Sequence, residues 1–352
     1  MEHLIDRFGE PALMLATGIA VGALFGFAAY QSRFCLRAAT AEVATGQFGP
    51  KLAIWLVAFS FALACVQLAS FVGVLDVSAA RQLATTGSIS GAMIGGSLFG
   101  IGMVLARGCA SRLLVLSASG NLRAIVTGLV LTLVAQASLR GVLAPIREKL
   151  AALWTVPGGE ARSLISSDVS STGWITMTCV ALAVAAFVFG LRKRAKTKDM
   201  VFAALVGFAV FGGWHMTYAI SHASFEIIAI QSVTFTGPST DTLMGLVNER
   251  TLPQSFGLGM VPGVFVGAML AAFLRGEARI QRFEPDVPME RYLLGGALMG
   301  FGSMLAGGCA VGAGLTGGSI LALTAWIAVF FMWLGAVATH VLLQSWTRFQ
   351  PA

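Results

Sequence analysis

The sequence has 352 residues, of which 57% are hydrophobic and only 11% are charged. Soluble domains usually carry about 25% charged residues, so this composition excludes an ordinary water-soluble enzyme or binding module. The mean hydropathy is +0.82, and 42 glycines suit helices that pack closely in lipid. The composition therefore predicts an all-α integral membrane protein, and the net charge of +7 requires no nucleic-acid partner.

Nine apolar runs follow one another along the chain, each near the length of about 20 residues that spans a bilayer. The first run lacks the basic start and the cleavage site of a signal peptide, so we expect it to be retained. Residues 143–172 are expected to form a loop outside the membrane, and residues 192–198 a basic hairpin. The nine expected spans are residues 12–30, 51–75, 89–107, 122–142, 173–191, 200–220, 255–275, 290–307 and 320–345.

Lysine and arginine are distributed unequally between the segments that join these spans. With the basic hairpin at 192–198 placed in the cytoplasm, 16 of the 23 Lys and Arg residues lie on the cytoplasmic side and seven lie outside. Loops rich in Lys and Arg stay in the cytoplasm during insertion. The sequence therefore predicts a periplasmic N-terminus and a cytoplasmic C-terminus.

An internal repeat relates the two parts of the chain. Residues 96–110 read GSLFGIGMVLARGCA and residues 296–310 read GALMGFGSMLAGGCA. A weaker similarity aligns the segment ending in Cys35 with the one ending in Ser221, so that Ser221 replaces Cys35. An odd connecting helix inverts the second half, and transporters with inverted halves bind substrate near the midplane. The expected domain is single (1–352), with halves 12–142 and 200–345 and connector 173–191.

Three of the five cysteines lie where an expected span is interrupted, and Gly108 or Gly308 precedes two of them. No pair has the CxxC spacing of a redox or zinc site. Cys65 and Cys179 fall inside apolar runs and are expected to pack as small hydrophobic side chains. If short helices begin after the breaks, their free amides would face an anion. The alternative is that the three cysteines at the breaks, Cys35, Cys109 and Cys309, only pack at helix ends.

The settings RFCLR, GCASR and AGGCAVGAGLTGG resemble the YeeE/YedE sulfur-transport family over residues 15–345. The resemblance implies an hourglass-shaped bacterial inner-membrane protein with short re-entrant helices that takes up thiosulfate. It implies a substrate path lined by three cysteine thiols. The matching path residues are Cys35, Cys109 and Cys309 with their neighbours Gly108, Gly308, Ala110 and Ala310. Many relatives have Ser and His after the last cysteine, where this chain has Val311 and Ala313, so a polar contact near the site is missing or is supplied elsewhere, which bears on the substrate more than on the fold.

Ionisable groups at membrane depth are functional candidates. Arg37 and Arg112 follow two of the cysteines and could contact an anion or anchor their loops. His222 and Glu226 are four residues apart and are expected to share a helix face, with a role in anion contact or in tying loops together. The roles of His215 and His340 stay open at this point, as does that of Glu42, which follows Cys35.

We expect the chain to be a transporter and not an enzyme, without a metal or cofactor. Its sequence contains no HExxH, GxSxG or Walker A motif. One alternative is a membrane sulfurtransferase that carries a cysteine persulfide. Another is a transporter of a selenium or other sulfur species that feeds a cytoplasmic carrier. Relatives often work beside a small SirA-like sulfur-carrier protein, which the hairpin at 192–198 could bind.

Overall fold

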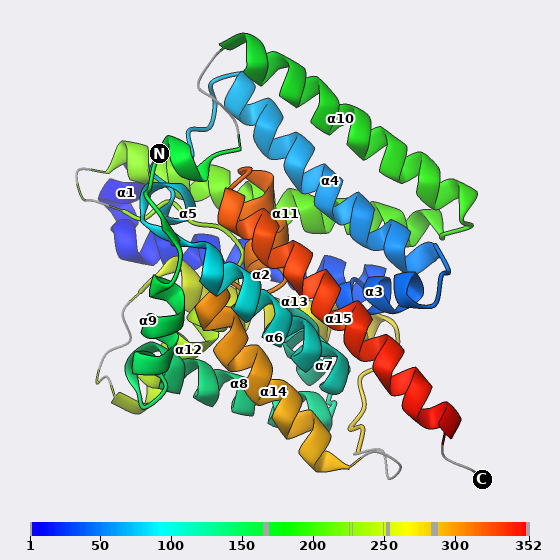
Figure 1. Cartoon of the computed structure of the whole chain (residues 1–352). Helices are drawn as coiled ribbons and strands as arrows, with labels where there is room; N and C mark the ends of the chain where they lie inside the picture. Colours follow the sequence, from blue (N-terminus) through cyan, green and yellow to red (C-terminus); the bar gives the residue numbers. More distant parts are fainter. Residues whose placement is uncertain are drawn as a thin grey trace.

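The computed structural model describes residues 2–164, 169–224, 226, 228–248, 250, 254–282 and 288–349, and this part of the chain is almost wholly helical (Figure 1). In chain order its elements are α1 (Glu2–Phe8), α2 (Glu10–Ser32), α3 (Leu36–Ala44), α4 (Pro50–Phe71), α5 (Arg81–Ala84), β1 (Gly87–Ser88), α6 (Ile89–Leu105), α7 (Ala110–Ala118), α8 (Leu122–Arg140), α9 (Ala144–Ala152), β2 (Thr155–Val156), the 3-10 helix η1 (Glu160–Arg162), α10 (Val169–Arg192), α11 (Thr197–Ala223), α12 (Thr236–Asn248), α13 (Phe256–Leu274), α14 (Met289–Ala306), the π-helix η2 (Gly312–Gly317) and α15 (Leu323–Phe349).

The expectation of an all-α membrane protein is confirmed. Within the described residues, eight helical stretches are long and apolar enough to cross a membrane. The ninth expected span, 290–307, is the helix α14, which is less apolar because it begins with Glu290 and Arg291. The segment 143–172, expected to be a plain loop, contains α9, and β2 pairs antiparallel with β1.

Glycines let four of the long helices touch backbone to backbone. A Cβ added at Gly22 of α2 would lie 2.4 Å from the carbonyl oxygen of Met260 in α13, and one at Gly263 would lie 2.4 Å from that of Ile19. In the same way Gly95 of α6 lies against Gly302 of α14. Packing of this kind replaces the hydrophobic effect as the force that holds helices together in lipid.

The main contacts between a helix of the first part of the chain and one of the second part each have a counterpart in which the two parts take each other's roles. The helix α2 packs on α13 as α11 packs on α4, and α6 packs on α15 as α14 packs on α8. The short helices follow the same rule, because α3 contacts α15 as α12 contacts α8. The helix α10 stands apart from this exchange and packs along α4 (Figure 1).

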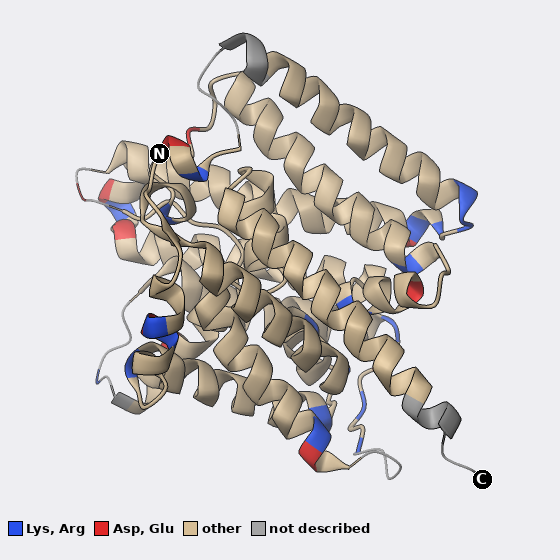
Figure 2. Cartoon of the chain, in the orientation of Figure 1, with Lys and Arg blue, Asp and Glu red and all other residues tan. Residues whose placement is uncertain are grey.

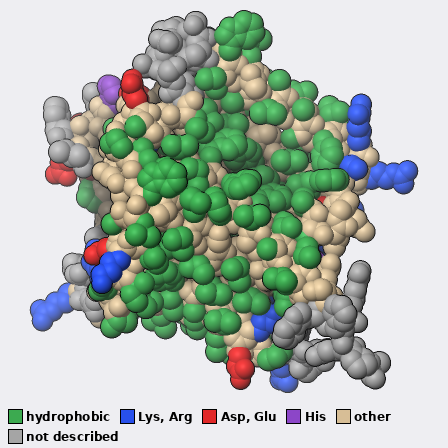
Figure 3. All heavy atoms as spheres, viewed as in Figure 1, with side chains coloured by type: hydrophobic (Ala, Val, Ile, Leu, Met, Phe, Trp, Pro, Cys, Tyr) green, Lys and Arg blue, Asp and Glu red, His purple; other side chains and the backbone are tan. Residues whose placement is uncertain are grey.

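The surface agrees with a lipid-facing bundle. Lysine, arginine, aspartate and glutamate lie around the helix ends, and the ribbon between them is almost free of charge (Figure 2). Hydrophobic side chains cover most of the visible face (Figure 3). Large apolar groups such as Trp174, 74% exposed, and Phe330, 63% exposed, would be unfavourable in water over so wide an area. The chain is therefore a multi-pass membrane protein.

Candidate functional site

The three cysteine-bearing breaks share one backbone design. In each, a long helix ends at a residue in the left-handed conformation two positions before the cysteine: Arg33 (φ 54°), Arg107 (φ 54°) and Gly307 (φ 78°). The next amide then bonds back across the last turn, as Gly308 N–H does to Ser303 O at 2.9 Å. This geometry satisfies carbonyls that the helix end would leave unpaired. It also stops the helix sharply and turns the cysteine into the protein interior.

Cys35 and Cys109 meet at the starts of two short helices. Cys35 is the N-cap residue of α3 and Cys109 that of α7. Their side chains share a hydrogen bond, and the Ala38 and Arg112 amides face the two sulfurs. Both thiols are buried, and the Cys109 sulfur lies 3.3 Å from the Ser111 hydroxyl. Helix-start amides and thiols together make a compact group of donors for a soft anion.

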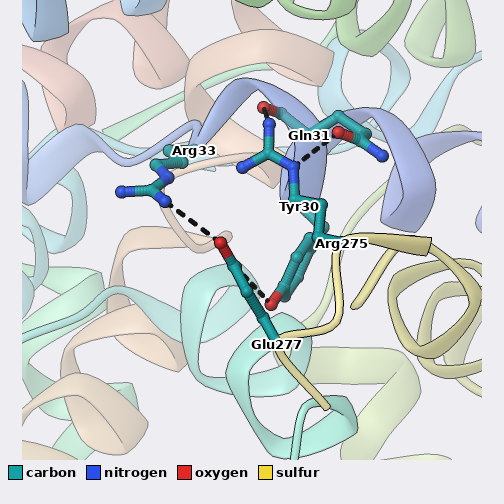
Figure 4. Close-up of polar contacts among 5 residues, drawn as sticks. All are labelled: Tyr30, Gln31, Arg33, Arg275 and Glu277. Carbon is teal, nitrogen blue, oxygen red and sulfur yellow. Dashed lines mark hydrogen bonds and ion pairs between the residues drawn. The ribbon is translucent and has the colours of Figure 1, made fainter. Parts of the chain in front are cut away.

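A polar network ties the break before Cys35 to the end of α13 (Figure 4). The Arg275 guanidinium donates from Nε to Gln31 Oε1 at 2.7 Å and from Nη2 to Gln31 O at 2.8 Å. Glu277 accepts from the Tyr30 hydroxyl at 2.9 Å and from Arg33 Nη2 at 3.3 Å. A cation at the carboxyl end of α2 complements the helix dipole. The bonds from Arg275 to the buried Gln31 therefore fix the position from which Cys35 is presented, whereas the exposed Arg33–Glu277 pair adds little.

A second arginine, Arg123, stabilises the helix end before Cys109. Arg123 is buried, and its Nη1 donates to Ala106 O at 3.0 Å, at the carboxyl end of α6. Its guanidinium also lies 5.1 Å from the ring centre of Tyr292. Both helices that lead into the thiol pair thus end on an arginine supplied by another helix.

Arg37 and Arg112 bring positive charge to the thiol pair. Both act electrostatically on Cys35. The Nε atom of Arg37 and the Nη1 atom of Arg112 are buried and have no hydrogen-bond partner among the described residues. A buried guanidinium N–H without an acceptor is costly. An anion held beside Cys35 and Cys109 would provide that acceptor.

Cys309 occupies the third break, at the entrance to the π-helix η2. Its sulfur accepts a hydrogen bond from Gly312 N–H at 3.5 Å, and its side chain is only 1% exposed. The segment before α12 packs directly on η2, since Thr316 donates to Val233 O at 2.5 Å. The Thr234 hydroxyl lies so close to Gly312 that an added Cβ there would approach it to 2.3 Å. Thr234 therefore supplies a polar group beside this loop, where Val311 and Ala313 cannot.

The expected equivalence of Ser221 and Cys35 is wrong. Ser221 lies inside α11, which continues to Ala223, and its hydroxyl donates to Ile228 O at 3.0 Å. In the second half the short helix α12 begins after Phe235, so Phe235 holds the place of Cys35. Sequence reasoning missed this because the connecting segment after α11 is longer than the one after α2.

His222 and Glu226 do not share a helix face as expected, because α11 ends before Glu226. His222 and Glu226 are both exposed, and the Glu226 amide donates to the Ser224 hydroxyl at 2.9 Å. Glu42 has a local role, since its carboxylate accepts from the Leu52 amide at 2.9 Å and so caps α4. The His340 ring lies 3.1 Å from the Gln344 amide near the end of α15.

The remaining candidates surround the breaks or lie away from them. Ala110 and Ala310 are buried directly after their cysteines. A Cβ on Gly308 would lie 3.0 Å from Ala313 N, whereas Gly108 has room for one. Cys179 packs with Leu63 and Leu321, and all five cysteines are free thiols. Among the described residues, no group of three His, Cys, Asp or Glu side chains could hold a metal ion.

The comparisons with known proteins identify the class to which this fold and these breaks belong. The chain is a member of a membrane transport family, because residues 31–338 match the family model described as "Sulphur transport". It is 30% identical over 337 residues to the thiosulfate transporter TsuA of Spirochaeta thermophila, a match that covers 92% of this chain and 97% of that protein.

A second relative is the thiosulfate transporter TsuA of Escherichia coli strain K12. It is 28% identical over 342 residues, and the match covers 92% of each chain. The expectation of a sulfur-transport family is thus confirmed. Membership of a transporter family also agrees with the expectation that the chain is not an enzyme.

Proposed function

We propose that the chain takes up thiosulfate, or a closely related sulfur anion, across the bacterial inner membrane along a path lined by Cys35, Cys109 and Cys309. The observation that carries the proposal is the pairing of Cys35 with Cys109 beside arginines whose buried N–H groups find no acceptor in the described part of the chain. The names of the relatives supply the substrate. The charge distribution between loops supports a periplasmic N-terminus and a cytoplasmic C-terminus.

The path lies between two inverted halves, residues 12–142 and 200–345, joined by a connector at 173–191. The exchange symmetry of the helix contacts supports this division. The symmetry relates the loop at Cys109 to the loop at Cys309, so the anion meets a thiol from each half. Inverted halves place such sites near the bilayer midplane.

The chemistry of passage follows from the groups present. A thiol donates a weak hydrogen bond to the terminal sulfur of thiosulfate, and backbone amides at the starts of α3 and α7 attract its charge. Several weak sites in series let an ion enter and leave, whereas one strong site would trap it. Arg37 and Arg112 balance the two negative charges beside the first pair of thiols.

The test is uptake of radiolabelled thiosulfate into proteoliposomes by Cys35→Ala, Cys109→Ala and Cys309→Ala variants, with Cys65→Ala as the matched control. We expect loss of uptake in the first three variants and unchanged uptake in the control. Equal uptake by Cys109→Ala, Cys309→Ala and the unsubstituted protein, at equal reconstitution, would overturn the proposed path.

The persulfide alternative predicts a different product. A thiolate would attack the outer sulfur of thiosulfate, leaving a cysteine persulfide and releasing sulfite. Intact-mass measurement after exposure to thiosulfate distinguishes the two, since a transporter leaves Cys109 and Cys309 unmodified. Delivery of the anion to a small SirA-like sulfur carrier at the hairpin 192–198 is a further element of the proposal, and co-purification with such a carrier tests it.

A further inference from the structure

A pocket of about 560 Å³ lies between α1, the segment after α4 and the last turns of α11, away from the cysteine breaks. It holds three of the four histidines in the chain. The pocket lies at the carboxyl end of α11, whereas the basic hairpin adjoins the amino end of the same helix. In the predicted orientation the pocket therefore faces the outer side of the membrane. The lining residues are His3, Val74, His215, Tyr218, Ala219, His222 and Ala223.

The polar groups of this pocket come mainly from one face of α11. His215, Tyr218 and His222 follow one another at three- and four-residue spacing, so their side chains point to the same side. The His215 ring is stacked on Phe211 at 5.6 Å between centres, which fixes its orientation. Its Nδ1 atom is buried and has no hydrogen-bond partner in the part of the chain that the structure describes.

The lining groups define the kind of ligand. Imidazole and phenol donate hydrogen bonds, and no carboxylate is among the described lining residues. A metal ion does not fit, because no three ligating groups in the described part of the chain come close enough together. A polyatomic anion with several acceptor oxygens suits the donors.

We propose that this histidine pocket binds a sulfur oxyanion at the outer face before the anion reaches the thiols. The proposal rests on the proposed function and on the predicted orientation. Its donors bond to oxygen and do not distinguish sulfate from thiosulfate. The pocket therefore collects oxyanions, and selection for the terminal sulfur falls to Cys35, Cys109 and Cys309.

The small number of histidines allows a direct test of binding. The purified full-length protein, labelled with ¹⁵N-histidine, gives signals from only four side chains, which single His→Asn variants assign. We expect saturable shifts of the His215 and His222 signals on titration with sodium thiosulfate and also with sodium sulfate. The His340 signal lies outside the pocket, near the end of α15 and within electrostatic reach of Arg37, so it reports on the cysteine site instead. Shifts of the His215 and His222 signals that do not saturate would overturn the pocket.

Transport kinetics give a second readout. The His215→Asn/His222→Asn variant should raise the KM for thiosulfate about tenfold, the effect of one or two lost hydrogen bonds, with its maximal rate kept. The control Cys65→Ala should leave both parameters unchanged. Cys109→Ala should lose uptake but keep the histidine shifts. Saturable histidine shifts without any thiosulfate uptake by the unsubstituted protein would overturn the proposed function and support the pocket. Normal uptake without histidine shifts would overturn the pocket and support the proposed function.

Discussion

The Arg275 guanidinium donates hydrogen bonds to Gln31 Oε1 at 2.7 Å and to Gln31 O at 2.8 Å. These bonds join the end of α13 to the end of α2. Gln31 lies in the last turn before the break that presents Cys35, and its side chain is buried. The contact thus connects two distant parts of the sequence at the point where Cys35 is positioned. Hydrogen bonds to a charged donor contribute about 1.5–3 kcal/mol each.

Replacing Arg275 by Ala should therefore destabilise the Cys35 break. We expect slower thiosulfate uptake and faster reaction of Cys35 with a maleimide, because the carboxyl end of α2 would lose both bonds. Mass spectrometry of the labelled protein measures the reaction at each cysteine. Arg33→Ala is the matched control, because its bond to Glu277 is exposed and surface ion pairs contribute about 0–1 kcal/mol. Equal labelling of Cys35 in both variants would contradict the role of Arg275.

The glycine contacts between α2 and α13 give a prediction about stability. A Cβ at Gly22 would lie 2.4 Å from Met260 O, and a backbone carbonyl cannot move aside as a side chain can. We expect Gly22→Ala to lower the free energy of unfolding by about 1–3 kcal/mol, the usual effect of overpacking. Thermal unfolding of the protein in detergent, followed by loss of monodisperse protein, measures the change.

Gly212→Ala in α11 is the control for that substitution. A Cβ at Gly212 would meet nothing within 4 Å, so only the gain in helix propensity remains. That gain is about 0.5–1 kcal/mol in favour of alanine. The two variants should thus move the midpoint of unfolding in opposite directions. The close packing of α2 on α13 would be refuted if both moved it the same way.

The left-handed residue before Cys309 gives a third prediction. Gly307 has φ 78° and open space around its α carbon, so a substitution there meets strain but no clash. Gly307→Ala should cost about 1–2 kcal/mol, whereas Gly307→Asn should cost less, because asparagine adopts this conformation more readily. Unfolding midpoints of the two variants measure the difference. A smaller loss for alanine than for asparagine would show that the break does not depend on backbone conformation.

The sequence predicted the helices and the breaks well because both depend on the residues of short, continuous segments. Apolar runs of the right length become spanning helices, and the pattern at Cys109 repeats at Cys309. The left-handed conformations of Arg33 and Arg107 could not be predicted, since arginine rarely adopts them. They are held by bonds across the last turn and, after α2 and α6, by arginines from other helices.

Contacts that depend on tertiary structure were beyond local reasoning. Ser221 was matched to Cys35 by similarity of the flanking residues, but α11 continues past it and ends at Ala223. Thr234 lies beside the Cys309 loop through a segment whose length no pattern specified. The bond between Cys35 and Cys109 joins two breaks that the sequence placed on the same side without indicating contact. Such juxtapositions follow from helix packing across the whole bundle.

The last prediction concerns Arg37 and Arg112, each of which has a buried N–H group without a partner in the described segments of the chain. If an anion is their acceptor, Arg112→Gln and Arg37→Gln should each raise the KM for thiosulfate about tenfold or more, as expected for a lost bond to a charged group. Arg112→Lys should retain part of the affinity, because lysine keeps the charge but loses the planar set of donors. Both side chains are half-buried, so salt screens their charges only in part and a difference should persist at high salt.

Uptake into proteoliposomes at a series of thiosulfate concentrations, with and without added salt, measures these effects. Arg33→Gln is the control, since Arg33 is exposed and already paired with Glu277. A KM for Arg112→Gln and Arg37→Gln equal to that of the control would assign both arginines to loop anchoring. A raised KM in both, with unfolding midpoints like that of the control, places the anion where the two guanidinium groups and the Cys35–Cys109 pair converge.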